Sequence, residues 1–256
     1  VNEFHSEGGI ARLLKNLIDG ELIYEDIHTV AGVGLSHYTK VPALGASQGS
    51  ELQWEELVTH SQPLKSITTA DKPYKPNGGI KFISGDIAEG LIKVSALKNE
   101  NETISAPVRV FLTQDEVLDS YERDELNQDM ILVLLGQSPS INGMPELHKL
   151  TSPINVLQTR GYKIALITDG RMSGASGSFP ALIHAVSENN NLYKIRTGDI
   201  LTLDLKECIL TIDSNEYQKR AAIEITPSNI GLGRELFKVF RDNVSSVKLG
   251  ATIFHE

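Results

Sequence analysis

Residues 163–178 read KIALITDGRMSGASGS, an apolar run followed by a loop that is rich in glycine and serine. The apolar part, residues 163–168, has the length and composition of a strand that is buried on both faces. Three glycines in the loop let the backbone approach a ligand closely. Residues 180–186 predict a helix after the loop, whose free N–H groups would favour an anion. This stretch therefore predicts a strand, a ligand-binding loop and a helix, an order typical of α/β proteins.

Side chains of the same loop could recognise an acid. Arg171 can hold a carboxylate or a phosphate through two parallel hydrogen bonds, and Ser173, Ser176 and Ser178 add hydroxyl groups. The loop matches neither the dinucleotide fingerprint nor the phosphate loop that ends in Gly-Lys-Ser/Thr. From the residues alone, a tight strand-to-helix turn with a surface arginine explains the loop equally well.

Patterns of strand and helix length surround this loop. Further strands are predicted at residues 80–83, 91–94, 107–111, 130–135, 200–203 and 209–212, and helices at 117–126, 145–159 and 233–244. Strands that alternate with helices, followed by a tail of short strands, predict an α/β fold with a mixed sheet or a barrel-like core.

The first part of the chain has a different character. Residues 9–22 carry apolar side chains at helical spacing, and Gly20 predicts the end of that helix. Residues 43–78 are dense in Gly, Ser and Pro, which marks a loop-rich segment and the expected domain boundary. We therefore expect one domain over residues 1–76 and a second over 77–256.

Composition argues against several classes of protein. The formal net charge of −9 argues against binding to a nucleic-acid backbone. No apolar stretch approaches the roughly 20 residues that span a bilayer, and the polar start of the chain is not typical of a signal peptide. The single cysteine, Cys208, excludes an internal disulfide and a multi-cysteine metal site made by this chain alone. A small molecule or another protein is the expected partner, in a cytoplasmic setting.

A second polar segment, residues 142–150, reads NGMPELHKL. Pro145 is expected in the first turn of a helix, where the helix dipole would favour the carboxylate of Glu146. His148 is expected to be exposed or to cap the helix.

Together the two segments resemble the signature of the dehydratase family that joins dihydroxy-acid dehydratase and 6-phosphogluconate dehydratase. Agreement extends along essentially the whole chain, and the form GMPELHKL favours the 6-phosphogluconate branch. The resemblance implies a C-terminal mixed β/α barrel-like domain of the swivelling type, preceded by the end of an α/β N-terminal domain. It also implies that the rest of that N-terminal domain is missing from this chain, and that the protein is a homodimer.

The resemblance further implies the chemistry. The family eliminates water from 2,3-dihydroxy acids to give 2-keto-3-deoxy acids. Ser173 would be the catalytic base, and Glu146 would bind Mg²⁺, which prefers hard oxygen ligands. The implied substrate contacts are Arg171, Gly174, Ser176 and Lys93. Lys93 and Arg234 are candidate anion contacts, although lone basic residues are more often solvated or ion-paired. The second implied cofactor is a 4Fe–4S iron–sulfur cluster, held by cysteines of the N-terminal domain.

Two features depart from the family pattern. Residues 134–140, LLGQSPS, lack the basic residue that relatives usually carry there, which bears on how substrate charge is recognised. Cys208 lies in a strand-like run outside any cluster motif, and we expect it to be a buried structural residue. Two alternatives therefore stay open: another dihydroxy-acid or sugar-acid dehydratase of the same family, and a non-catalytic remnant that binds sugar acids or a partner subunit.

Overall fold

The chain divides into two compact units. The computed structural model describes residues 1–45, 51–58, 64–99, 102–173, 178–228, 230–231 and 233–254. The first unit runs from Val1 to Asn77 and the second from Gly78 to Glu256. This division falls beside the boundary expected after residue 76. That the first unit completes an N-terminal dehydratase domain stays a prediction.

Short elements build the first unit. They are α1 (Asn2–Ser6), α2 (Gly9–Asp19), the strand pair β1 (His28–Thr29) and β2 (Gly32–Val33), the 3₁₀ helix η1 (Ser36–Thr39), and the strand pair β3 (Val41–Leu44) and β4 (Leu52–Glu55). α2 confirms the helix predicted over residues 9–22, and the N–H of Gly20 closes it by donating to the carbonyl of Asn16. The buried carboxylate of Glu7 accepts backbone N–H bonds from residues 65–67 at 2.7, 2.8 and 3.1 Å, which ties the helical region to that segment.

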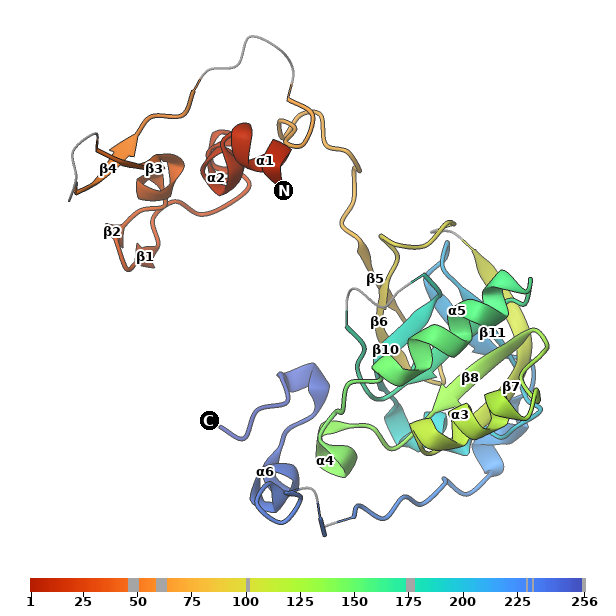
Figure 1. Ribbon diagram of the computed structural model, residues 1–256. Coiled ribbons are helices and arrows are strands. Elements are labelled where there is room, and N and C mark those ends of the chain that lie inside the picture. Colours follow the sequence, from red (N-terminus) through yellow and green to blue (C-terminus); the bar gives the residue numbers. More distant parts are fainter. Residues whose placement is uncertain are drawn as a thin grey trace. The chain divides into compact units, whose positions relative to one another are not determined.

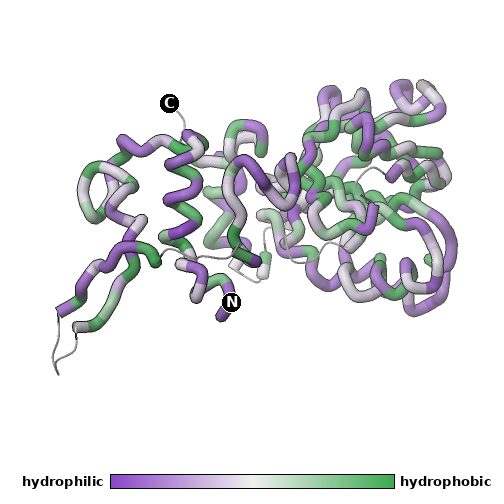
Figure 2. The backbone as a smooth tube through the Cα atoms, turned by 90° about the horizontal axis from the view of Figure 1, so that it is seen from above, coloured by the Kyte–Doolittle hydropathy of each residue, from purple (hydrophilic) through white to green (hydrophobic). Residues whose placement is uncertain are grey.

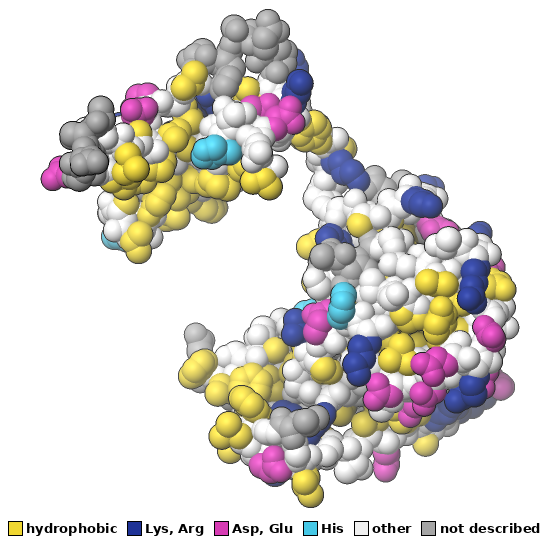
Figure 3. Space-filling view, in the orientation of Figure 1, with side chains coloured by type: hydrophobic (Ala, Val, Ile, Leu, Met, Phe, Trp, Pro, Cys, Tyr) yellow, Lys and Arg dark blue, Asp and Glu magenta, His cyan; other side chains and the backbone are white. Residues whose placement is uncertain are grey.

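Many apolar side chains of the first unit are exposed. Figure 3 shows hydrophobic side chains over much of its visible face. Tyr24, Val30 and Leu44 are 84%, 103% and 81% exposed. Burial of one large apolar side chain stabilises a protein by about 1.5–3 kcal/mol. The exposed side chains among the described residues of this unit do not make that contribution.

An eight-stranded mixed sheet forms the centre of the second unit (Figure 1). Its strands are β5 (Ile80–Ile83), β6 (Glu89–Lys93), β7 (Thr103–Phe111), β8 (Met130–Leu134), β9 (Ile164–Thr168), β10 (Ala181–Val186), β11 (Ile200–Asp204) and β12 (Ile209–Ile212). Their spatial order is β12-β11-β7-β8-β9-β10-β6-β5. β7 to β10 pair in parallel, whereas the outer pairs are antiparallel. The strands predicted from the apolar runs are thereby confirmed.

Alternate residues of β8 face opposite sides of the sheet. Ile131 and Val133 belong to an apolar cluster to which all eight strands contribute. Met130 and Leu132 belong to a second cluster, which includes residues of the helices α3 (Gln114–Glu122) and α5 (Thr151–Thr159). Figure 2 shows hydrophobic segments inside this unit and hydrophilic ones along its outer loops. β8 is therefore buried on both faces, as its continuous apolar run predicts.

The two edge strands are joined just after β5. Ser84 forms an isolated parallel bridge with Ile209. Its N–H donates to the carbonyl of Cys208 at 3.1 Å, and its carbonyl accepts the N–H of Leu210 at 2.9 Å. Gly85 passes so close that a Cβ atom there would lie 2.0 Å from the carbonyl oxygen of Leu210. The sheet therefore closes on itself, which confirms the predicted α/β, barrel-like fold class.

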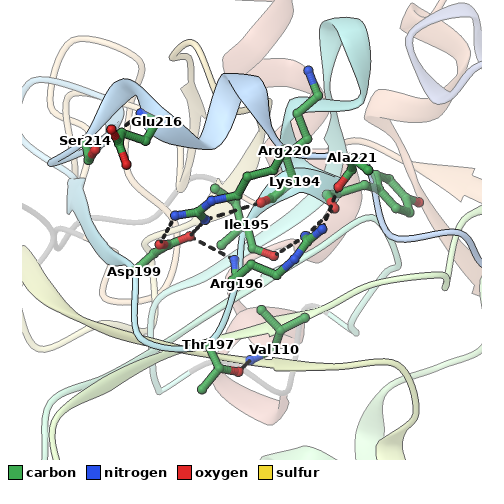
Figure 4. Close-up of polar contacts among 11 residues, drawn as sticks. Val110, Lys194, Ile195, Arg196, Thr197, Asp199, Ser214, Glu216, Arg220 and Ala221 are labelled. Atoms are coloured by element: carbon green, nitrogen blue, oxygen red, sulfur yellow. Dashed lines mark hydrogen bonds and ion pairs between the residues drawn. The ribbon is translucent and has the colours of Figure 1, made fainter.

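A bidentate ion pair fixes the connections around β11 (Figure 4). Nη1 and Nη2 of Arg220 lie 2.6 and 3.0 Å from the two carboxylate oxygens of Asp199. The backbone N–H of Arg196 donates to the same carboxylate at 2.8 Å. The guanidinium of Arg196 in turn donates to the carbonyls of Tyr193, Ile195 and Ala221. These charged groups are thus used for structure.

Several helix predictions differ from the structure. Residues 181–186 form strand β10, so the helix predicted there is wrong; ladders with β9 on one side and β6 on the other outweigh the helix propensity of alanine and leucine. The helix predicted over 145–159 begins only at Thr151, with the 3₁₀ helix η2 (His148–Leu150) before it. The helix predicted over 233–244 is restricted to α6 (Lys238–Asn243). None of the helices among the described residues is long and apolar enough to cross a membrane.

Candidate active site

Two loops begin at the carboxyl ends of the neighbouring parallel strands β8 and β9. Leu134 pairs with Thr168 on the last rung of this ladder, so the loops after the two strands start side by side. In β/α barrels and in open α/β sheets alike, ligands bind beyond the carboxyl ends of the parallel strands. Both polar segments that stand out in the sequence, residues 142–150 and 168–178, follow these strand ends.

Asp169, directly after β9, anchors the loop that follows β8. Its carboxylate accepts backbone N–H bonds from Gly136 (3.2 Å), Gln137 (2.9 Å) and Ser138 (3.2 Å), and a hydroxyl hydrogen bond from Tyr193 (2.6 Å). Burial raises the pKa of Asp169, and these four donors oppose the rise by favouring the charged form. Residues 136–138, which lie in the segment that departs from the family pattern, therefore form a cradle of N–H donors around a buried carboxylate.

Glu146 holds the loop that follows β9. An isolated parallel bridge joins Glu146 to Arg171. Oε2 of Glu146 lies 3.2 Å from Nη1 of Arg171, and Oε1 accepts the backbone N–H of Ser173 at 2.7 Å. Nε of Arg171 donates to the carbonyl of Met144 at 2.8 Å. The predicted base, the predicted metal ligand and one predicted substrate contact therefore lie together.

Neither polar segment stands at the start of a helix, contrary to the prediction. Glu146 lies in the segment before η2, and α5 begins at Thr151. The helix dipole therefore does not explain the position of this carboxylate, whereas its contacts with Arg171 and Ser173 do. The chain after the glycine-rich loop enters β10, so the anion site expected from a helix over residues 180–186 is wrong as well.

The other predicted residues are distributed more widely. Lys93 ends β6, which β10 separates from β9 in the sheet. Gly174 and Ser176 lie outside the described residues. His148 is exposed, as expected. Of the predicted site residues, Glu146, Arg171 and Ser173 are those that the described contacts bring together.

Sequence reasoning missed three residues near these loops. Asp169 had a visible signal, since a carboxylate directly after a buried strand is a common site position. Tyr193 had none, because only the fold brings it to Asp169. His184 is half-buried at an unusual positive φ of 54°, and its backbone N–H donates to the carbonyl of Gly170 at 2.8 Å. Burial, with the nearby charge of Arg171, lowers the pKa of His184.

Residues suited to a metal or a cluster are few. Cys208 is only half-buried, in a turn before β12, so the prediction that it is a buried strand residue is wrong, although it packs against the apolar core. An iron–sulfur cluster needs several thiolates, so the residues of this chain do not fit one. Within the part of the chain that the structure describes, no three His, Cys, Asp or Glu side chains are grouped to hold a metal ion. Glu146 could contribute one oxygen ligand to a magnesium ion.

Polar loops at the carboxyl ends of adjacent parallel strands are typical of ligand-binding sites in α/β domains, both in barrels and in open sheets. In a comparison with family models, the model "Dihydroxy-acid/6-phosphogluconate dehydratase C-terminal" matches residues 65–251. The chain belongs to the dihydroxy-acid/6-phosphogluconate dehydratase family.

Curated relatives match the chain along its whole length. The phosphogluconate dehydratase of Pseudomonas aeruginosa is 41% identical, covering 100% of this chain and 43% of that protein. The phosphogluconate dehydratase of Escherichia coli K12 is 40% identical, covering 98% and 42%. The dihydroxy-acid dehydratase of Sulfurisphaera tokodaii is 30% identical, covering 98% and 43%. The predicted resemblance is confirmed, and the chain spans less than half the length of these relatives.

Proposed function

We propose that this chain forms the serine-loop part of a phosphogluconate dehydratase. This hydro-lyase would convert 6-phosphogluconate to 2-keto-3-deoxy-6-phosphogluconate in the Entner–Doudoroff pathway. The observation that carries the proposal is the identity of 41% and 40% to relatives named phosphogluconate dehydratase, against 30% to the dihydroxy-acid dehydratase. Glu146, Arg171 and Ser173 support it, because they form one bonded group at the end of the sheet.

In this proposal Ser173 takes the proton from C2 of the sugar acid. The C3–O bond breaks, the departing hydroxide takes up the proton held by Ser173 and leaves as water, and the resulting enol tautomerises to the 2-keto acid. A serine hydroxyl is too weak an acid to serve as a base unaided, so nearby positive charge has to stabilise its ionised form. Arg171 carries such a charge two residues away, and the hydrogen bond from the Ser173 N–H to Glu146 fixes the backbone that carries the hydroxyl.

The proposal includes cofactors and partners that the family resemblance implies. Glu146 would supply one ligand to Mg²⁺, and when bound, the iron–sulfur cluster would supply Lewis acidity at the C3 hydroxyl. The cluster would rest on cysteines outside this chain, since Cys208 is its single cysteine. The exposed apolar side chains of the first unit support a contact with a further, N-terminal domain. A homodimer in the cytoplasm is part of the same proposal.

Turnover by the full-length protein tests the proposal. The protein is assayed, with its iron content measured, for release of a 2-keto acid from 6-phosphogluconate, gluconate and a branched 2,3-dihydroxy acid. We expect the highest kcat/KM with 6-phosphogluconate. A higher kcat/KM with another acid would contradict the proposed substrate and favour another dihydroxy-acid or sugar-acid dehydratase of the family. A fully iron-loaded protein without turnover on any of them would favour the non-catalytic remnant.

A further inference from the structure

A cavity of about 430 Å³ lies beside the candidate active site and carries two arginines. Its lining residues, which we call the arginine pocket, are Asn142, Gly143, Arg234, Phe237, Phe240 and Arg241. The short helices α4 (Pro139–Asn142) and α6 pack against each other here (Figure 1). The pocket thus joins the loop after β8 to the C-terminal segment of the unit.

Hydrogen bonds connect the pocket to the anchor of the site. The guanidinium of Arg234 donates to Oδ1 of Asn142. Asn142 in turn donates through Nδ2 to Oε1 of Gln137 at 2.9 Å, and the N–H of Gln137 donates to Asp169. Arg241 is buried, and its Nη2 donates to the carbonyl of Arg234 at 2.9 Å. Both arginines are therefore held in place before any ligand arrives.

One wall of the pocket is next in sequence to a contact of the serine loop, by which we mean the loop that follows β9 and carries Arg171 and Ser173. Gly143 lines it, and the next residue, Met144, accepts the hydrogen bond from Nε of Arg171. Consecutive Cα atoms lie about 3.8 Å apart, so the residue in the wall of the pocket directly precedes the residue that holds Arg171. A ligand several bonds long could lie in the pocket with one end and meet the serine loop with the other.

The chemistry of the lining favours a phosphate group. A guanidinium offers five N–H donors in a planar fork that matches phosphate oxygens. The contact with Asn142 uses one of the N–H donors of Arg234. Phe237 and Phe240, which are 58% and 40% exposed, form the apolar part of the wall. The backbone N–H of Gly231 lowers the pKa of Glu235, and the nearby charge of Arg241 lowers it further. Arg241 is buried, whereas Arg234 is only partly buried, so Arg234 is the stronger candidate ligand.

We propose that the arginine pocket binds the terminal phosphate of a phosphorylated sugar acid, with Arg234 as the principal contact and Arg241 in support. The identity of that sugar acid rests on the proposed function, whereas the binding of a phosphate group does not. The pocket would also supply the positive charge that residues 134–140 lack relative to the family pattern. Substrate charge would then be recognised by the C-terminal segment.

The test compares phosphorylated and unphosphorylated substrates in the full-length protein. Arg234→Ala is expected to lower kcat/KM for 6-phosphogluconate about 10- to 100-fold through KM, which corresponds to the loss of a charge-assisted hydrogen bond. The value for gluconate should stay within about twofold. Arg234→Lys keeps the charge but loses the planar fork, so its kcat/KM for 6-phosphogluconate should lie between those of the wild type and Arg234→Ala. The matched control is Arg160→Ala, an exposed arginine that contacts Asp124 and Asn127. An equal loss on both substrates would overturn the inference.

Direct binding separates this inference from the proposed function. If the wild-type protein turns over neither substrate, the proposed function fails by itself, and the pocket is tested by calorimetric titration with inorganic phosphate and with acetate. The wild type should bind phosphate in preference to acetate, and Arg234→Ala should lose that binding while it melts at the wild-type temperature. Phosphate affinity that is equal in the two proteins would overturn the proposal. If Arg234→Ala does not fold, Arg234→Lys carries the same comparison.

Discussion

The carboxylate of Glu146 accepts a hydrogen bond from the backbone N–H of Ser173, with Oε1 2.7 Å from the nitrogen. The other carboxylate oxygen pairs with Arg171. One side chain from the loop after β8 therefore fixes both the backbone of Ser173 and the direction of the Arg171 side chain. A change at residue 146 should act on Ser173 without altering it.

Glu146→Gln should lower kcat of the full-length protein about 100-fold, because a glutamine oxygen can still accept the N–H but cannot pair with Arg171. Ser173→Ala should lower kcat about 10²- to 10⁴-fold, which is the usual contribution of a positioned base. Ser178→Ala is the control, since its hydroxyl contacts Asn155 at the far end of the loop. Steady-state kinetics on 6-phosphogluconate measures all three, and wild-type kcat in Glu146→Gln would contradict the role given to this carboxylate.

Asp169→Ala should destabilise the second unit by about 3 kcal/mol or more, because it leaves three backbone N–H groups and one hydroxyl with no acceptor. Tyr193→Phe removes only one of these donors and should cost about 1–2 kcal/mol. Chemical denaturation monitored by circular dichroism gives both values. Equal stability of Asp169→Ala and the wild type would show that the cradle around residues 136–138 is held by other contacts.

Gly85→Ala should weaken the closure of the sheet. The new Cβ would lie 2.0 Å from the carbonyl oxygen of Leu210, so one of the two backbones has to move. We expect a loss of about 3 kcal/mol or more in the free energy of unfolding. Gly78→Ala is the matched control, since a Cβ there meets nothing within 4 Å. A melting temperature of Gly85→Ala equal to that of the control would contradict the closed sheet.

The ion pair between Asp199 and Arg220 predicts a pH dependence of stability. Burial acts to raise the pKa of Asp199, but the hydrogen bonds and charge of Arg220, with the N–H of Arg196, outweigh it, so the pKa lies below its ordinary value. The pair therefore adds stability above the unfolded-state pKa of about 3.9, and this contribution is lost as the pH falls through the lower folded-state value.

Asp199→Asn measures that contribution. It should cost about 1–2 kcal/mol at neutral pH, since the pair is partly exposed. The difference from the wild type should shrink as the pH falls below about 4. Urea denaturation at a series of pH values records it, and a difference that grows toward acid would reverse the sign assigned here.

Much of the barrel could be predicted from the sequence, because a strand such as 130–134 that is buried on both faces is a continuous apolar run. Local pattern failed where distant pairing decides the conformation. Residues 181–186 contain good helix formers, yet β9 and β6 supply hydrogen bonds on both sides and make them a strand. Glu146 stays extended for a similar reason, since Arg171 lies across from it. The serine loop was found through its resemblance to a family, whereas Tyr193 could be found only through the fold.

The bridge between Ser84 and Ile209 has a consequence for synthesis on the ribosome. β5 and β6 leave the exit tunnel first among the strands of this unit, but their partners β12 and β10 come much later in the chain. Contacts between distant parts of a chain slow folding and leave strand edges open in the meantime. The nascent hairpin of β5 and β6 therefore exposes one apolar face until β10 and β12 have been synthesised. We expect chaperones to bind the chain during this interval.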